Sequence, residues 1–231
     1  MSILLAIGPM FFKMMNDKNN KRFYSKILTY MAFFFMLIVL VLSMFSEEVI
    51  KILAKNQEYW QAYILVPFLS FSIFFSMLKD VTILGLNIVK RTKVISAILI
   101  VVCLINTGLN YFLIPAFGII GSALSALLTQ MIYFILIYIN AQKWYPVPYE
   151  LKKIIVIVLT GTSLAGISYS LSGFNSYIEA SAKFLLILIF PFILYFFNFY
   201  ERIEIIRIRE TYRKFKNPKS WIYLIKNKLK K

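Results

Sequence analysis

Residues 105–126 read INTGLNYFLIPAFGIIGSALSA, a stretch that is almost wholly apolar but carries two asparagines, a proline and several glycines. Apolar sequence continues on both sides of it far enough to form a long helix each way. Pro115 cannot continue a helix interior, and it biases Ile114 away from helical backbone angles. The stretch therefore predicts a helical hairpin, with helices at 94–114 and 118–140 and a connection of about four residues around Pro115.

The composition of the whole chain indicates a membrane protein. Of its 231 residues, 60% are hydrophobic and 16% are charged, whereas soluble domains are about 25% charged. Each of several apolar runs is close to the ~20 residues that a helix needs to cross ~30 Å of hydrocarbon. These runs lie at 27–45, 62–86, 94–114, 118–140, 154–172 and 182–200. They do not alternate in polarity as barrel strands do, so residues 1–200 are predicted to form an all-α bundle of six transmembrane helices.

The basic residues predict how these helices are oriented. Of the 26 Lys and Arg residues, 22 lie in four segments that the six crossings place on one side of the membrane. These segments are 13–26, 87–93, 141–153 and 201–231. Because cytoplasmic loops are enriched in Lys and Arg, we expect this side to be cytoplasmic. Segment 201–231 is then a basic cytoplasmic tail that lies on anionic membrane lipid.

The first dozen residues, MSILLAIGPMFF, are too short to span a membrane. They lack the positive start and the small-residue cleavage site of a secretory signal peptide. We interpret them as a partial helix, the last turns of one whose beginning is missing. A re-entrant or interfacial segment is the alternative.

The residue types present exclude several functions. The chain has no His and a single cysteine, Cys103, so no thiol or metal cluster can form around that residue, and no Gly-rich phosphate loop is present. The net charge of +16 follows the topology, and no nucleic-acid-binding motif accompanies it. We therefore expect a protein that is not an enzyme, with no cofactor, no metal site and no nucleic-acid partner.

Polar residues inside the apolar runs are the candidates for function, because polar groups in hydrocarbon are costly and face a protein interior or a water-filled cavity. Ser76, Asp80 and Asn87 share one face of the predicted second helix. Lys79 lies about 100° from Asp80 around that helix, which predicts that the two do not pair along it. Counting from Lys90 at ~1.5 Å per residue places Lys79 roughly 16 Å deep. It either lines a substrate path, snorkels to the interface, or pairs with a neighbouring helix.

The predicted hairpin carries two further candidates. Asn106 and Asn110 lie one turn apart, and asparagine side chains bond across membrane helices more often than they contact a ligand. Both are nevertheless kept as residues that line a substrate cavity. Gly118, Gly121 and Ser125 are small and let a neighbouring backbone come close.

One ordered set of residues carries a family resemblance. It comprises Gly85, Lys90, Arg91, Lys93, Asn106, Leu109-Asn110, Ile114-Pro115, Phe117-Gly118, Gly121-Ser122-Ala123 and the stretch from Tyr145 to Tyr149. In this order the residues resemble the C-terminal half of polysaccharide-unit flippases, such as O-antigen or capsule repeat-unit transporters, in the multidrug/oligosaccharidyl-lipid/polysaccharide exporter superfamily. A looser similarity extends over the rest of the chain.

The resemblance implies one lobe of a two-lobe exporter that works by alternating access without hydrolysing ATP. Its cargo would be an undecaprenyl-pyrophosphate-linked oligosaccharide, moved across the bacterial inner membrane, and Lys79 is a hypothetical attractor for the pyrophosphate. Because family members have a second lobe, we expect either a truncated or split product, or pairing with a second copy or a separate first-lobe chain. The alternatives are a multidrug or metabolite exporter coupled to Na⁺ or H⁺ through Asp80, and a membrane scaffold without transport.

Overall fold

The computed structural model describes residues 8–11, 13–15, 17, 19–54, 56–171, 176–197 and 199–200. The predicted tail 201–231 lies outside them. Within this part of the chain every regular element is a helix, as predicted. The elements are α2 (Asn20–Met44), α3 (Ser46–Leu53), the 3-10 helix η1 (Gln57–Ile64), α4 (Leu65–Ile88), α5 (Thr92–Phe117), α6 (Ile119–Trp144), α7 (Leu151–Ser170) and α8 (Ser176–Phe196).

Six of the described helices are long and apolar enough to cross a membrane, with η1 and α4 forming one continuous span. This confirms the predicted number of spans. Several ends differ from the prediction by a few residues; α8, predicted at 182–200, begins at Ser176 and ends at Phe196. Between its two end turns a helix satisfies its own backbone hydrogen bonds, which is what a chain requires where no water is available.

The chain divides into two compact units, Met1–Phe190 and Pro191–Lys231. In the second unit the described residues are the last turns of α8 together with Phe197, Phe199 and Tyr200, and the Phe199 N–H donates to the Leu194 carbonyl at 3.2 Å. All the sites discussed below lie in the first unit.

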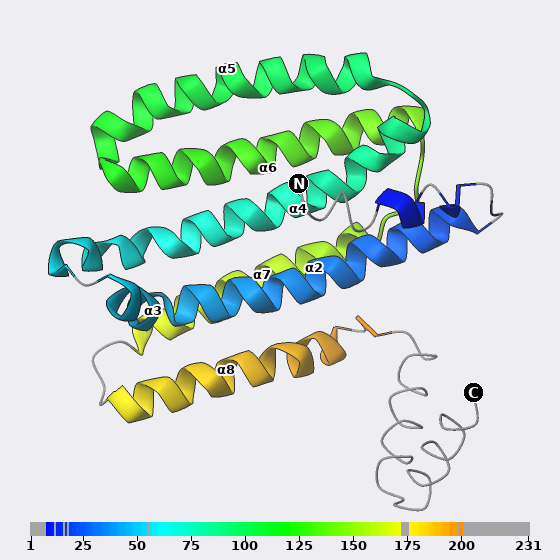
Figure 1. The fold of residues 1–231 in the computed structure, drawn as a ribbon. Coiled ribbons are helices and arrows are strands. Elements are labelled where there is room, and N and C mark those ends of the chain that lie inside the picture. The colour runs from blue at the N-terminus through cyan, green and yellow to red at the C-terminus, as the bar shows by residue number, and fades with distance from the viewer. Residues whose placement is uncertain are drawn as a thin grey trace, which may run out of the picture. The chain divides into compact units, whose positions relative to one another are not determined.

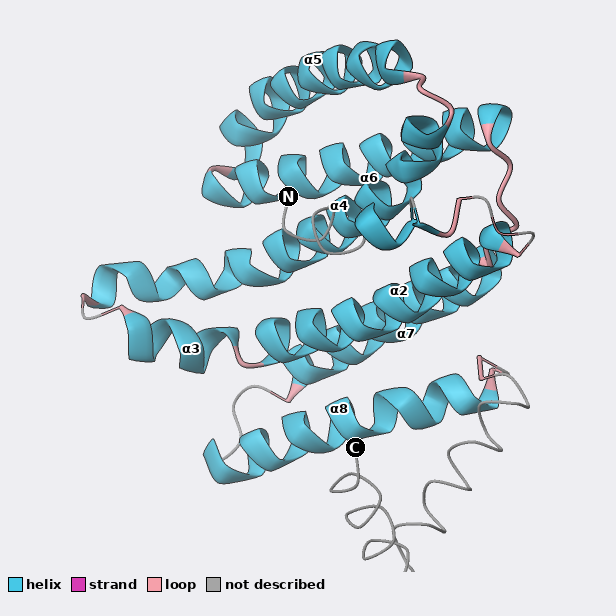
Figure 2. Cartoon of the chain, turned by 45° about the vertical axis from the view of Figure 1, so that its right-hand side comes forward, coloured by secondary structure: helices cyan, strands magenta, loops and turns pink. Residues whose placement is uncertain are grey.

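Within the first unit α4 is central. It packs against α6 on one side and α2 on the other, α2 packs against α7, and α5 contacts the rest mainly through α6 (Figure 1). The same order is visible in the rotated view of Figure 2. Only 11% of the α5 span is buried, against 44% of the α2 span, so α5 presents most of its apolar surface outward.

The turn between α5 and α6 differs from the prediction. Helix α5 does not stop at Ile114 but continues through Pro115 to Phe117, and Gly118 alone joins the two helices. Gly118 has φ +57° and ψ −133°, a conformation that L side chains rarely adopt and glycine tolerates. Pro115 lies inside α5, two residues before its end, and its missing N–H costs the helix one hydrogen bond. Glycine, and not proline, therefore reverses the chain.

Gly121 brings the backbones of α5 and α6 into contact, as the sequence predicted. A Cβ atom at this position would fall well inside van der Waals distance of the Leu113 carbonyl group on α5. No other residue type fits there unless the helices separate.

One end of the bundle gathers the basic loops, and we call it the basic end. The Lys21 ammonium lies 5.3 Å from the ring centroid of Tyr145, and the Arg91 guanidinium lies 3.8 Å from that of Trp144. The start of α2, the α4–α5 turn and the end of α6 therefore lie together, as the predicted topology requires. That the basic end faces the cytoplasm stays a prediction.

Glu150 ties the basic end together. Its carboxylate accepts hydrogen bonds from Lys26 at 2.8 Å and from Thr29 at 3.0 Å, both on α2, and it forms an ion pair with Lys153 at 3.1 Å. Burial raises the pKa of Glu150, but these hydrogen bonds and the charge of Lys153 outweigh it and lower the pKa below its ordinary value. The ionised carboxylate is therefore favoured in the folded state.

A Glu150→Gln variant is expected to be less stable than the wild type at neutral pH. Because the folded-state pKa of Glu150 is lowered, its stabilisation is present above the unfolded value of about 4.3 and is lost as pH falls through the folded value. The difference in melting temperature between variant and wild type, measured in detergent from pH 7 to pH 3, should shrink toward the acid end. An Asp17→Asn variant, which removes an exposed carboxylate at the same end, serves as control. A difference that stayed constant with pH would contradict the assignment.

Candidate functional site

Helix α4 carries a charged pair inside its membrane-spanning part. The Lys79 Nζ atom lies 3.0 Å from Asp80 Oδ1, and the two side chains are only 14% and 12% exposed. The prediction that the two residues do not pair along the helix was wrong. The long Lys79 side chain bends around the helix surface to reach the shorter carboxylate beside it. The ion pair therefore forms within α4 and not with a neighbouring helix.

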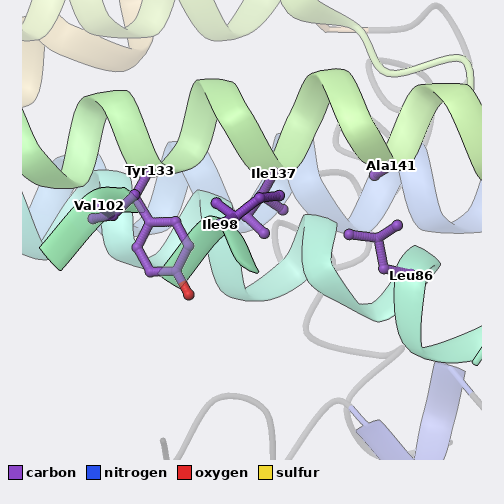
Figure 3. Close-up of a cluster of buried hydrophobic side chains, with 6 residues drawn as sticks. All are labelled: Leu86, Ile98, Val102, Tyr133, Ile137 and Ala141. Carbon is purple, nitrogen blue, oxygen red and sulfur yellow. The ribbon is translucent and has the colours of Figure 1, made fainter. Parts of the chain in front are cut away.

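An aromatic ring from α6 covers this pair. The Lys79 Nζ atom lies 4.7 Å from the ring centroid of Tyr133, a distance at which the ring face attracts a cation. Tyr133 is itself held in an apolar cluster with Ile98 and Val102 of α5 and Ile137 of α6 (Figure 3). The cluster fixes the ring, and the ring helps to hold the ammonium group.

Tyr133 also lines a cavity of about 290 Å³ at the α5–α6 interface. The lining residues are Leu99, Val102, Cys103, Asn106, Ala126, Thr129, Gln130 and Tyr133. The Gln130 Oε1 atom is buried and has no hydrogen-bond partner among the described residues. Because a buried acceptor without a donor is costly, it is suited to accept a hydrogen bond from a polar group that enters the cavity.

A chain of hydrogen bonds joins α5 to α6 beside the cavity. The Asn106 amide donates to the Thr129 hydroxyl at 2.9 Å, the Asn110 amide donates to the Asn106 carbonyl oxygen at 3.1 Å, and the Ser125 hydroxyl donates to Asn110. These bonds confirm the predicted linking role of the two asparagines. Asn106 in addition lines the cavity, and its predicted contact with a substrate stays a prediction.

The remaining predicted residues are less closely connected to the cavity. Ser76 and Asn87 are half-buried on α4. Like Lys79, Asp80 and Asn110, they are not among the residues that line the cavity. Asn87 lies in the last turn of α4, where its carbonyl accepts a hydrogen bond from the Lys90 N–H at 3.0 Å. The structure thus brings together Lys79 and Asp80, and separately Asn106 and Asn110, with Tyr133 between the two pairs.

Three residues of the site were missed by the sequence analysis: Thr129, Gln130 and Tyr133. All belong to α6, and Thr129 and Tyr133 are one turn apart on the same face. That spacing of polar groups within an apolar run was an available signal. It was obscured because tyrosine is common in this chain, with 15 copies.

The fold is similar to that of a solved structure. The structure titled "Lipid II flippase MurJ, inward closed conformation" matches with a TM-score of 0.62 and 18% sequence identity, over 80% of this chain and 41% of that one. This chain therefore spans about two fifths of the length of that flippase. No family profile and no curated protein matches the sequence. The likeness is one of fold: the helices of this chain are arranged like those in part of a membrane flippase.

Proposed function

We propose that the chain is one lobe of a transporter that moves an undecaprenyl-pyrophosphate-linked oligosaccharide across the bacterial inner membrane. The observation that carries this proposal is the Lys79 ammonium group, which is buried in a membrane-spanning helix against the ring of Tyr133, a residue that lines a partly polar cavity. A pyrophosphate needs a cation within hydrocarbon, and sugar hydroxyls need hydrogen-bonding groups. Lys79 supplies the cation, and Asn106 and Gln130 supply the hydrogen-bonding groups.

The pairing of Lys79 with Asp80 suits a transporter. In the substrate-free state the carboxylate and the Tyr133 ring stabilise the ammonium group, so no buried charge is left alone. An entering phosphate competes with Asp80 for Lys79. Because one anion replaces another, the ammonium group stays paired, whereas Asp80 loses its partner while the substrate is bound and so favours substrate release.

The proposal also requires a second lobe. The likeness covers 41% of the flippase structure, and a substrate path between two lobes needs two walls. We propose that a second copy or a separate first-lobe chain provides the opposite wall. The basic end faces the cytoplasm in this arrangement, with the 201–231 tail on anionic lipid.

The proposal is tested by replacing both members of the ion pair, Lys79→Met with Asp80→Leu, in the cells that produce the protein. We expect the variant to reach normal levels in the membrane, while surface glycan falls at least ~10-fold, corresponding to about 1.4 kcal/mol or more of lost substrate stabilisation. Undecaprenyl-linked oligosaccharide should accumulate on the cytoplasmic face. Lys152→Met, which removes an exposed charge at the basic end, is the matched control. Normal glycan export by the paired variant would refute the proposal.

The alternative of a cation-coupled drug exporter is less well supported by the geometry. Such an exporter would need Asp80 to bind and release its coupling ion, whereas the carboxylate is already paired with Lys79. Loss of drug resistance with intact glycan export in the same variant would favour that alternative. A scaffold without transport would show neither loss.

A further inference from the structure

A second polar site lies at the end of the bundle opposite the basic end. The end of α2, the start of α3, η1, the end of α7 and the first two turns of α8 surround a pocket of about 60 Å³. Its oxygen-bearing lining includes Ser43, Ser46, Tyr63, Ser168, Glu47 and Glu179. Since one water needs about 10–15 Å³ of such space, the pocket has room for a single small ion with a few waters.

The cation that lines the pocket is already satisfied. The Lys183 ammonium, only 4% exposed, lies 2.7 Å from Glu48 Oε1 and 2.7 Å from Glu179 Oε1. It also lies 5.7 Å from the ring centroid of Phe45. Lys183 therefore neutralises one carboxylate and joins α8 to α3, and it does not serve as a binding group for an anion.

Within the described part of the chain, two oxygen atoms lack partners, one on Ser43 in the pocket and one on Glu48, which pairs with Lys183 but does not line the pocket. The Ser43 hydroxyl lines the pocket and is buried, with the residue 4% exposed, and no described group bonds to its Oγ. The second carboxylate oxygen of Glu48 is also buried without a hydrogen-bond partner among the described residues. The unused groups are therefore oxygen acceptors, which are the ligands of hard cations.

The charges around the pocket do not balance. Among the described residues, Glu47, Glu48 and Glu179 carry three negative charges, while Lys51, paired with Glu47, and Lys183 carry two positive ones. One negative charge is left over. Glu47 and Glu48 are 40% and 42% exposed, so solvent screens part of this charge, and one monovalent cation would neutralise it.

We propose that this pocket binds one monovalent alkali cation, with oxygen ligands from Glu179, Glu47 and Ser43. A divalent ion is disfavoured by the charge balance, and no group of three or more His, Cys, Asp or Glu side chains in the described chain is placed to hold a metal ion. The bound cation ties the α2–α3 junction to α8. This site is separate from the Lys79 cavity, and the proposal does not rest on the proposed function.

The test measures thermal unfolding of the purified full chain in detergent at constant pH and ionic strength. Lithium, sodium or potassium chloride replaces N-methylglucamine chloride in steps. We expect a saturable rise in melting temperature with at least one alkali cation. Glu179→Gln should weaken the apparent affinity at least ~10-fold and Ser43→Ala roughly 3-fold, since a charged ligand contributes more than a neutral one.

Glu58→Gln is the matched control, because it removes an exposed carboxylate in η1, outside the pocket. It should respond to cations as the wild type does. If Glu179→Gln fails to fold, two measurements still test whether the pocket binds an alkali cation. They are the cation response of Ser43→Ala and the equilibrium binding of radioactive sodium to the wild type. The proposal is overturned if alkali cations act no differently from N-methylglucamine, if Ser43→Ala keeps the wild-type response, or if only acidification stabilises the protein, because a proton then neutralises the cluster.

Discussion

A Gly121→Ala variant is expected to lose about 3 kcal/mol of stability, at the upper end of the cost of overpacking. The added methyl group would meet the Leu113 carbonyl of α5. Backbone cannot move aside as a flexible side chain can, so α5 and α6 must separate and weaken the hydrogen bonds between them. Thermal unfolding in detergent measures the effect.

Gly108→Ala is the control for this prediction. Gly108 lies in the same hairpin, and nothing lies within 4 Å of a Cβ atom built there. Alanine is favoured over glycine in a helix by roughly 1 kcal/mol, so this variant should be as stable as the wild type or more so. Equal stability of Gly121→Ala and Gly108→Ala would show that the two helices can separate at little cost.

Removing one member of the buried ion pair should have the other large effect. Lys79→Met alone leaves Asp80 as an unpaired carboxylate, and Asp80→Leu alone leaves the ammonium unpaired, each at a cost of about 3–5 kcal/mol. Replacing both residues removes both charges and should cost far less than the sum of the single changes. Unfolding of the single and double variants in detergent gives this coupling directly.

The two single variants and the double variant form a double-mutant cycle. If their losses of stability were nearly additive, this would contradict the buried pairing and would mean that water reaches both groups. The cycle also bears on transport. A double variant that is stable but inactive separates a role in substrate binding from a role in folding, whereas single variants could be inactive merely because they unfold.

The number and placement of the helices could be predicted because length and apolarity are properties of each segment alone. The α5–α6 turn could not. The preference of Pro115 for ending a helix is local, whereas a backbone in hydrocarbon gains by continuing its hydrogen bonds to the last turn. Helix α5 therefore runs on to Phe117, and Gly118, read from sequence only as a small residue, makes the turn.

In the candidate site, too, some features could be predicted from the sequence and others could not. Asn106 and Asn110 were correctly expected to bond across helices, since a buried amide has few other options. The relation of Lys79 to Asp80 was wrong because angular position on a helix describes Cβ directions and not the reach of a long side chain. Tyr133 and Gln130 acquire their roles only where α4, α5 and α6 meet. Lys183 and Glu48 are separated by 135 positions in the sequence, so no local pattern could pair them.

The single-residue connection at Gly118 has a consequence for how the protein enters the membrane. Helices α5 and α6 leave the ribosome in immediate succession, and with no loop to hold them apart they must insert as a pair. Four polar side chains that the two helices would otherwise expose to lipid are bonded across that pair, Asn106 to Thr129 and Asn110 to Ser125, at separations of only 23 and 15 residues. The hairpin can thus satisfy these amide and hydroxyl groups during synthesis, before α7 and α8 have been made.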